Sequence, residues 1–269
     1  MDKIRLIAWI TFKDCIRNKA LYGIFFMGLI LFSANIIITG MFTWELGKVA
    51  VDMGLSIISF SGLIIIFFLC LPILGNDIEK KTVYLILSRP VTKAHYIIGK
   101  YMGLGLIIMI SSVFLGLCAA LSVKISVMGA GTFIPPHFSW GMFTLSICYL
   151  TLSLLILLSL AFFWVCTSTH HFTAVLLTIM TYFICHNMEN VKNIILSTKI
   201  MSSDSLSIKV INAVTWILPN LTAFDLKTTA AYGLPVNTLS LSWLLIYGVS
   251  YSVVCIMLTV LIFQKRELS

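Results

Sequence analysis

The chain has 269 residues, of which 59% are hydrophobic and only 10% are charged. A soluble globular domain carries about 25% charged residues, so composition excludes a water-soluble fold and indicates an integral membrane protein. The formal net charge of +8 does not indicate a nucleic-acid partner, because the basic residues gather at the two termini and in 77–100, as expected of cytoplasmic segments of a membrane protein.

The N-terminal segment, residues 1–19, predicts an amphipathic helix that lies in the cytoplasmic interface of the membrane. Its apolar residues recur at helical spacing, and its basic residues lie largely on other faces. The long apolar run that follows begins near Leu21 and has no small-residue cleavage site after it. We therefore expect a retained spanning helix there and no cleaved signal peptide.

Long apolar runs predict an all-α integral membrane protein with six transmembrane helices in a single domain over 1–269. A spanning helix needs about 20 apolar residues, and most of the runs meet that length. The fifth run is short and needs His170 and His171 at its start to reach that length. The predicted spans are 20–43, 51–74, 98–123, 141–165, 172–188 and 241–263.

Charge predicts the orientation of these spans. With the N-terminus in the cytoplasm, the inner side carries most of the Lys and Arg, including those of the 75–97 loop and of the C-terminal tail. The reverse orientation would invert this bias. We expect both termini in the cytoplasm and a multi-pass protein of the cytoplasmic, or inner, membrane.

The outer segment 189–240 is much longer than the other predicted loops. It contains two patterned stretches, 191–200 and 208–218, and then Pro219-Asn220. A structureless loop of this length is unusual in a compact protein. We therefore expect short helices that rest on the outer surface or partly re-enter the membrane.

Motifs for catalysis or metal binding are absent from the sequence. The stretch from Gly75 to Thr82 superficially resembles a phosphate-binding loop, but Lys80 occupies the position where the required glycine would stand. No H-E-x-x-H is present, and none of the seven cysteines forms a C-x-x-C pair. The cysteines read as small packing residues. We predict no catalytic residue, no metal ligand and no cofactor in this chain.

Polar residues are scarce inside the predicted spans. Asn35 lies in the middle of the first span, where an amide needs a partner, and it either joins two helices or lines a path. Gly99 and Gly103 form a small-xxx-small pattern that favours close helix packing. No ionisable residue lies deep in a span, which argues against a proton- or sodium-driven carrier. A transporter of this kind would take its energy from another chain.

The inner loop resembles the first cytoplasmic loop of the ABC-2 type permeases. It is most similar to the branch that includes the membrane subunit of the nitrous-oxide-reductase maturation transporter. The segments Thr11–Lys19, Leu218–Phe224 and Phe263–Leu268 are similar too, in the same order, while Lys81 departs from the glycine of many members. The matching loop residues are Glu79, Thr82, Leu87, Pro90, Val91, Lys93, Gly99 and Lys100.

This resemblance implies a permease with the fold of type V exporters and a cytoplasmic coupling helix in the 75–97 loop. Its partners would be cytoplasmic ABC ATPases, which bind ATP and Mg²⁺, and a second permease copy or a paralogue. An outer or periplasmic partner is also compatible with it. Pro219, Asn220 and Phe224 would form an outer gate. The expected coupling residues are Asp77, Glu79, Thr82, Leu85, Leu87, Arg89, Pro90 and Lys93.

Two other functional classes stay open on sequence alone. The chain could be a non-transporting membrane anchor or assembly subunit of a larger complex, which co-purification with an ATPase would test. An intramembrane enzyme has less support, since no catalytic constellation is present. The substrate is not readable from the residues: a lipid, a peptide, a sulfur species and a metal complex are all compatible.

Overall fold

A computed structural model describes residues 2–41, 46–79, 92–129, 138–198, 217–235 and 237–265. All regular structure within these ranges is helical, which confirms the all-α prediction. The helices are α1 (Asp2–Arg17), α2 (Lys19–Met41), α3 (Leu46–Ile65), the π-helical turn η1 (Ile66–Cys70), α4 (Leu71–Glu79), α6 (Lys93–Gly129), α7 (Trp140–Thr167), α8 (His171–Thr198), the 3₁₀ turn η2 (Thr222–Phe224), α10 (Lys227–Tyr232) and α11 (Thr238–Lys265).

Within the described residues, five stretches are long and apolar enough to cross a membrane. They are Lys19–Met41, Gly47–Asp77, Lys93–Ser126, Trp140–Thr167 and Thr238–Lys265. Five of the six predicted spans are thereby confirmed, and the chain is a multi-pass membrane protein. The remaining span, 172–188, forms the first part of α8, whose apolar run ends in His186, Asn187 and Glu189. A sixth crossing by α8 stays a prediction.

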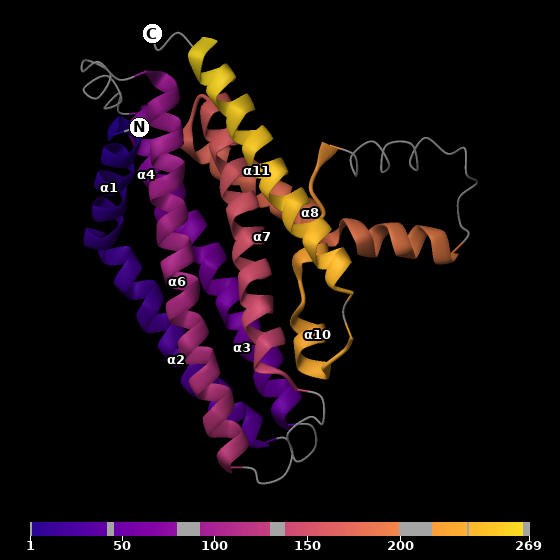
Figure 1. Ribbon diagram of the computed structural model, residues 1–269. Helices are drawn as coiled ribbons and strands as arrows, with labels where there is room; N and C mark the ends of the chain where they lie inside the picture. The colour runs from indigo at the N-terminus through magenta and orange to yellow at the C-terminus, as the bar shows by residue number, and fades with distance from the viewer. Residues whose placement is uncertain are drawn as a thin grey trace.

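Several helix ends lie together at one end of the bundle. The start of α1, the end of α11 and the turn between α7 and α8 lie together at the top of Figure 1, where α4 ends and α6 begins. The helices α3 and α7 begin at the opposite end. The start of α1 and the end of α11 thus lie at the same end of the bundle as the end of α4 and the start of α6. Which side of the membrane this end faces is a prediction based on charge.

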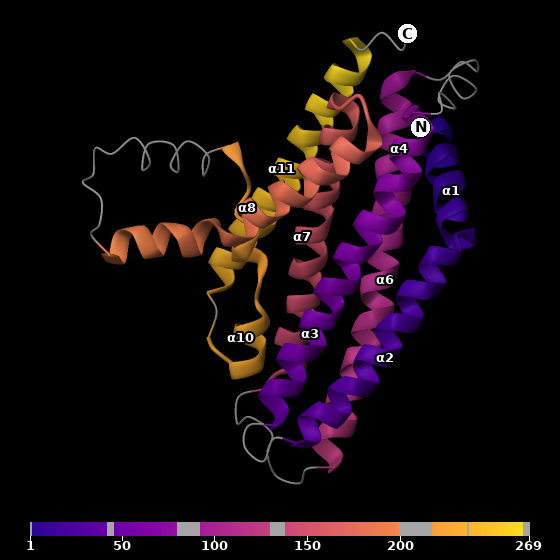
Figure 2. The same ribbon diagram turned by 180° about the vertical axis from the view of Figure 1, so that it is seen from behind.

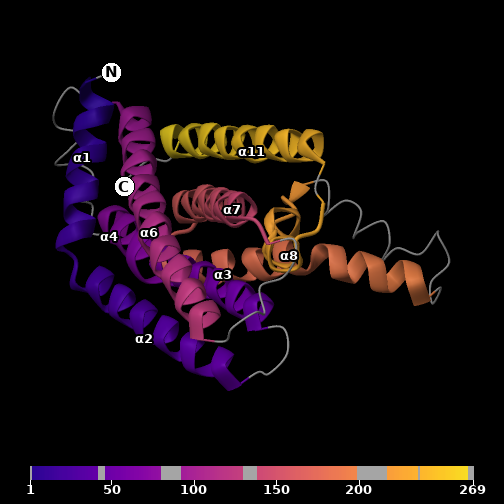
Figure 3. The ribbon, with the colours of Figure 1, turned by 60° about the horizontal axis from the view of Figure 1, so that its bottom comes forward.

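Helix α7 occupies the middle of the bundle, with α6, α11, α3 and α8 around it (Figure 3). It is the most enclosed of the five apolar stretches. The reverse view shows α2 and α3 running diagonally across the opposite face (Figure 2). The outer helices expose long apolar side chains, such as Phe26 of α2, Val113 of α6 and Trp243 of α11. Such a surface is compatible with lipid and not with water.

The second span is one continuous helical stretch from Leu46 to Glu79, longer than the predicted 51–74. A π-helical turn interrupts it, in which the backbone N–H of Leu71 donates to the carbonyl of Ile66. Pro72 follows directly, and a proline lacks the N–H for a helical bond and crowds the preceding turn. We attribute the widened turn to Pro72, because such turns are a known way to accommodate an irregularity within a helix.

The predicted 75–97 loop is shorter than expected. Residues 75–79 continue helix α4 and residues 93–97 already belong to α6. The prediction placed the loop boundaries where the apolar runs end. A helix does not have to end there, because Asn76, Asp77 and Glu79 are compatible with helical backbone once they lie outside hydrocarbon.

The predicted helix at 2–17 is present as α1 and runs alongside the first part of α6 (Figure 1). Its position in the membrane interface stays a prediction. Gly99 and Gly103 make this close approach possible. A Cβ atom added to Gly103 would lie 2.6 Å from the carbonyl oxygen of Ala8, and one added to Gly99 would lie 2.8 Å from the Cβ of Ile7. The small-xxx-small pattern therefore marks a helix–helix contact, as predicted, and its partner is α1.

The segment 189–240, which we predicted to lie outside with short helices, is helical in part, but its first patterned stretch belongs to a long helix. The first patterned stretch is the end of α8, whose second half projects away from the bundle (Figure 1). Most of the second stretch, 208–216, lies outside the described residues. Beyond it, η2 and α10 return to the bundle, where α10 contacts α3 and α7. The ammonium of Lys48 on α3 lies 4.7 Å from the centre of the Tyr232 ring on α10.

The glycine contact gives a direct test of the α1–α6 packing. Gly103→Ala should lower the thermal unfolding midpoint of the purified protein in detergent, because the new methyl group meets a backbone carbonyl that cannot move independently. Gly23→Ala is the matched control: a Cβ there meets nothing within 4 Å, so it should leave the midpoint unchanged or raise it by helix propensity. Equal midpoints for the two variants would contradict the packing.

Candidate functional site

An ion pair joins α4 to α6 at the end of the bundle that carries both termini. Asp77 accepts hydrogen bonds from the ammonium of Lys100 and, at 3.1 Å, from the hydroxyl of Tyr96. The side chain of Lys100 is only 7% exposed and that of Asp77 26%. Asp77 is thus directed into the bundle. A charge pair withdrawn from water in this way is costly to break, because either partner left alone would be buried and uncompensated.

The same cluster extends to the last helix. The ring of Tyr96 stacks on that of Phe263 of α11, with centroids 6.3 Å apart. Lys93 donates a hydrogen bond of 3.3 Å from its ammonium to the carbonyl oxygen of Gln264. We call Asp77, Lys93, Tyr96, Lys100 and Phe263 the inner joint. It connects α4, α6 and α11 at the two ends of the 80–91 connection.

The other predicted coupling residues take no part in the inner joint among the residues that the structure describes. Glu79, at the end of α4, is exposed. Five of them lie outside the described residues: Thr82, Leu85, Leu87, Arg89 and Pro90.

Asn35 joins three helices. It is 1% exposed, and its amide nitrogen donates to the carbonyl of Ala50 on α3 at 3.3 Å and to the hydroxyl of Ser122 on α6 at 3.2 Å. Its amide oxygen accepts a bond of 3.1 Å from the hydroxyl of Thr39. The sequence left two roles open for Asn35: joining helices or lining a transport path. These bonds support the first role.

The predicted gate residues lie on a segment held against α8. Asn220 donates to the carboxylate of Glu189 at 3.1 Å, the hydroxyl of Thr222 donates to the carbonyl of His186 at 2.6 Å, and the backbone N–H of Leu221 donates to the carbonyl of Cys185 at 3.3 Å. These bonds satisfy carbonyls near the middle of α8. Pro219, in the same segment, is buried.

Phe224 anchors this segment in the bundle. Its side chain is fully buried and stacks on Tyr247 of α11 with ring centroids 6.2 Å apart. A Cβ added to Gly248 of α11 would lie 2.9 Å from the Phe224 ring, so the glycine makes room for it. We call residues 217–232 the returning segment, because it passes from the end of α8 back between α7 and α3.

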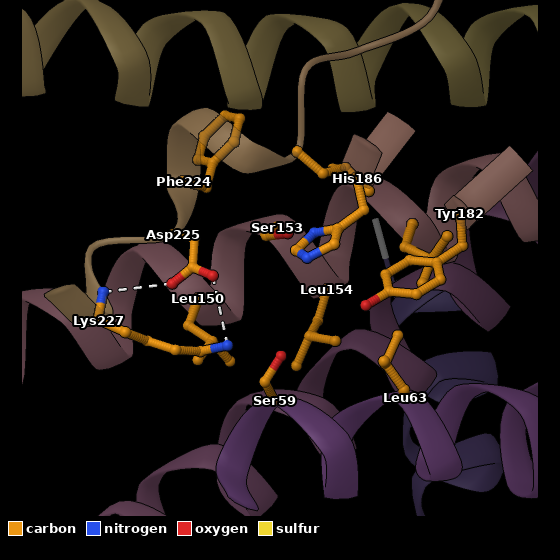
Figure 4. Close-up of a pocket in the computed structure, with 12 residues that line it drawn as sticks. Ser59, Leu63, Leu150, Ser153, Leu154, Tyr182, His186, Phe224, Asp225 and Lys227 are labelled. Atoms are coloured by element: carbon orange, nitrogen blue, oxygen red, sulfur yellow. Dashed lines mark hydrogen bonds and ion pairs between the residues drawn. The ribbon is translucent and has the colours of Figure 1, made fainter. Parts of the chain in front are cut away.

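The returning segment carries ionisable groups, Asp225 and Lys227, that were expected to lie outside the bundle because they belong to the predicted outer segment. Asp225 and Lys227 meet His186 of α8 beside Ser59 of α3 and Ser153 of α7 (Figure 4). Ser153 is 13 residues from the start of α7, or about 20 Å at the helical rise. Ionisable side chains therefore do lie near the middle of the bundle. Periodicity could not reveal this, since Asp225 and Lys227 lie outside the predicted spans.

The cysteines are free thiols, and five of the seven are buried. Cys15 of α1 is fully buried, and burial raises the pKa of its thiol to about 12, although Lys100 acts in the opposite direction. Such a thiol is a packing residue and not a nucleophile. Among the described residues no group of three or more His, Cys, Asp or Glu side chains could hold a metal ion.

The inner joint can be tested by neutralising its charges. Asp77→Asn and Lys100→Met should each lower the stability of the purified protein by roughly 1–3 kcal/mol, because the remaining partner is left unpaired. The double variant should lose less than the sum of the two. Glu79→Gln, at an exposed carboxylate on the same helix, should have little effect. Strictly additive losses, measured by thermal unfolding in detergent, would show that the two groups are independent.

Comparison of the chain with known protein families and with curated proteins finds no match. The resemblance to ABC-2 permeases therefore rests on the motif residues quoted above. The function of the chain is inferred from these residues and from the contacts of the sites described here.

Proposed function

We propose that this chain is the permease subunit of an ATP-binding-cassette transporter, which moves a substrate across the cytoplasmic membrane with ATP hydrolysed by a separate subunit. The observation that carries the proposal is the inner joint. It ties α4, α6 and α11 together where the 80–91 connection begins and ends. That connection holds four of the eight loop residues that resemble the family pattern: Thr82, Leu87, Pro90 and Val91.

The mechanism proposed here is mechanical. A cytoplasmic ATPase binds the 80–91 connection, and each cycle of ATP binding and hydrolysis displaces it. The displacement reaches α4 and α6 together, because Asp77 and Lys100 hold them in one unit, and reaches α11 through Lys93. A second copy of the chain, or a paralogue, completes the path that the substrate takes across the membrane. ATP and Mg²⁺ are bound by the ATPase and not by this chain.

Away from the inner joint, the returning segment is the proposed outer gate. Three hydrogen bonds hold Asn220, Leu221 and Thr222 to α8, and Phe224 fixes the segment between α7 and α11. A gate held this way moves with α8. The energetic link between ATP hydrolysis and the gate would then run through the helices and not through a separate lid.

The ATPase contact gives the decisive test. Leu85→Ala and Leu87→Ala should weaken co-purification of the ATPase and reduce transport-linked ATP hydrolysis, because an apolar anchor in a partner's groove can contribute about 2 kcal/mol or more. Lys93→Ala should weaken co-purification of the ATPase less, since the ammonium of Lys93 is bonded to α11. Membrane insertion should be unchanged in all three. Full retention of the ATPase with both leucines replaced would favour the alternative of a non-transporting anchor or assembly subunit.

The orientation is tested by cysteine labelling. In a background without the seven native cysteines, a membrane-impermeant maleimide added outside should fail to label Lys80→Cys and should label Asp204→Cys. Lys80 lies in the segment whose positive charge predicts the cytoplasmic side. The opposite labelling pattern would place both termini outside.

A further inference from the structure

An apolar groove lies on the outside of the bundle between α6 and α11. The two helices are close where the inner joint connects them and separate toward the start of α11, with α7 visible between them (Figure 1). Two cavities of ≈ 320 and ≈ 390 Å³ lie there. Both are lined by Leu152 and Leu155 of α7 and by Val249 of α11, so they are adjoining parts of one space. We call this space the α6–α11 groove, and α7 forms its floor.

The hydroxyl groups that line the groove have their hydrogens engaged within the chain. Each donates to a backbone carbonyl or to another hydroxyl at 2.7–3.3 Å, and they are those of Tyr101, Ser112, Tyr149, Thr151 and Ser252. The other side chains that line it are apolar, apart from the thiol of Cys148. A hydrocarbon chain needs no hydrogen bond and suits such a lining, whereas a polar molecule would lose its bonds to water there.

The groove is open sideways. Val113 of α6 and Val253 and Met257 of α11 line it and are 61%, 47% and 61% exposed. Both helices belong to the stretches able to cross a membrane, so the opening faces lipid and an acyl chain reaches it directly. A partner helix is about 10 Å across and fits less well, because the groove narrows to the contact between Tyr96 and Phe263, whose ring centroids are 6.3 Å apart.

Positive charge lies at this narrow end of the groove. The ammonium of Lys93 on α6 donates to the carbonyl of Gln264 on α11 at 3.3 Å and thus lies between the two helices. The next residue of α11, Lys265, is exposed. Both lysines stand at the end of an apolar stretch of spanning length, which is the level of the lipid head groups. Basic residues at that level attract anionic phospholipids.

We propose that the α6–α11 groove binds an acyl chain of an anionic phospholipid, whose phosphate lies against Lys265 and Lys93. The lipid comes from the leaflet at the end of the bundle that carries both termini. Its chain fills the space over Leu152 and Leu155 and adds contacts among α6, α7 and α11 where α6 and α11 have separated. The proposal does not depend on transport or on an ATPase.

The test measures the thermal unfolding midpoint of the whole purified chain in detergent while phospholipid is added. Phosphatidylglycerol, which is anionic, is compared with phosphatidylcholine that carries the same acyl chains. The midpoint should rise with phosphatidylglycerol and saturate, as binding to the folded state requires, and the apparent affinity should exceed that for phosphatidylcholine by roughly fivefold. Lys265→Gln should abolish most of this preference. Lys124→Gln, at an exposed lysine near the other end of α6, is the matched control and should keep it.

A second pair of variants tests the groove itself. Val249→Trp places a large ring where the two cavities adjoin and should weaken the binding of both phospholipids several-fold. Ile246→Trp is the matched control, because Ile246 lines neither cavity and is similarly exposed on the same helix, 55% against 46% for Val249. It should keep the wild-type response.

A phosphatidylglycerol with a photoreactive diazirine in its acyl chain locates the site in the wild-type protein. Cross-links should concentrate on Leu152, Leu155 and Val249 and not on Met180 of α8, which is 65% exposed. Three results would overturn the proposal: cross-links spread evenly over exposed apolar side chains, an equal response to the two phospholipids, or an unchanged response in Val249→Trp. So would a midpoint that rises with protein concentration and not with lipid, which would identify a second copy of the chain as the occupant.

Discussion

The hydrocarbon of a bilayer contains no hydrogen-bond partner, and this constraint governs the structure at every level. Backbone groups in such a solvent must bond within the chain, which leads to long helices. Side-chain hydroxyls follow the same rule: those of Thr11, Thr178 and Thr259 donate to the carbonyl one turn earlier on their own helix. An amide needs more partners, and Asn35 finds them on three different helices.

Charges near the bundle ends meet the same constraint by pairing. The Asp77–Lys100 pair adds little net stability if the cost of removing both groups from water offsets their attraction. Its effect is on specificity, because sliding α4 along α6 would separate the charges. Gly99 and Gly103, on the neighbouring face of α6, admit α1 at backbone contact distance. The first three turns of α6 therefore contact two other helices, α4 through Lys100 and α1 through the two glycines.

The sequence predicts those features that depend on composition and local spacing. Five spans, helix α1 and the glycine contact are of this kind. Helix ends are predicted less well, since an apolar run reports the hydrocarbon crossing and not the end of the helix: α3, η1 and α4 together extend to Glu79, and α6 extends to Gly129. Long-range placement was not predicted at all. Nothing in the spacing of Asp225 and Lys227 indicates that they meet His186, because the contact depends on how η2 turns beneath α8.

The returning segment is attached to the bundle by packing and by pairing. Phe224 and three bonds to α8 hold it in place. The carboxylate of Asp225 pairs with the ammonium of Lys227 at 3.3 Å, so neither charge is left isolated where the segment meets α3, α7 and α8. An unpaired charge withdrawn from water is costly, and the pair therefore lets this charged segment pack against apolar helices.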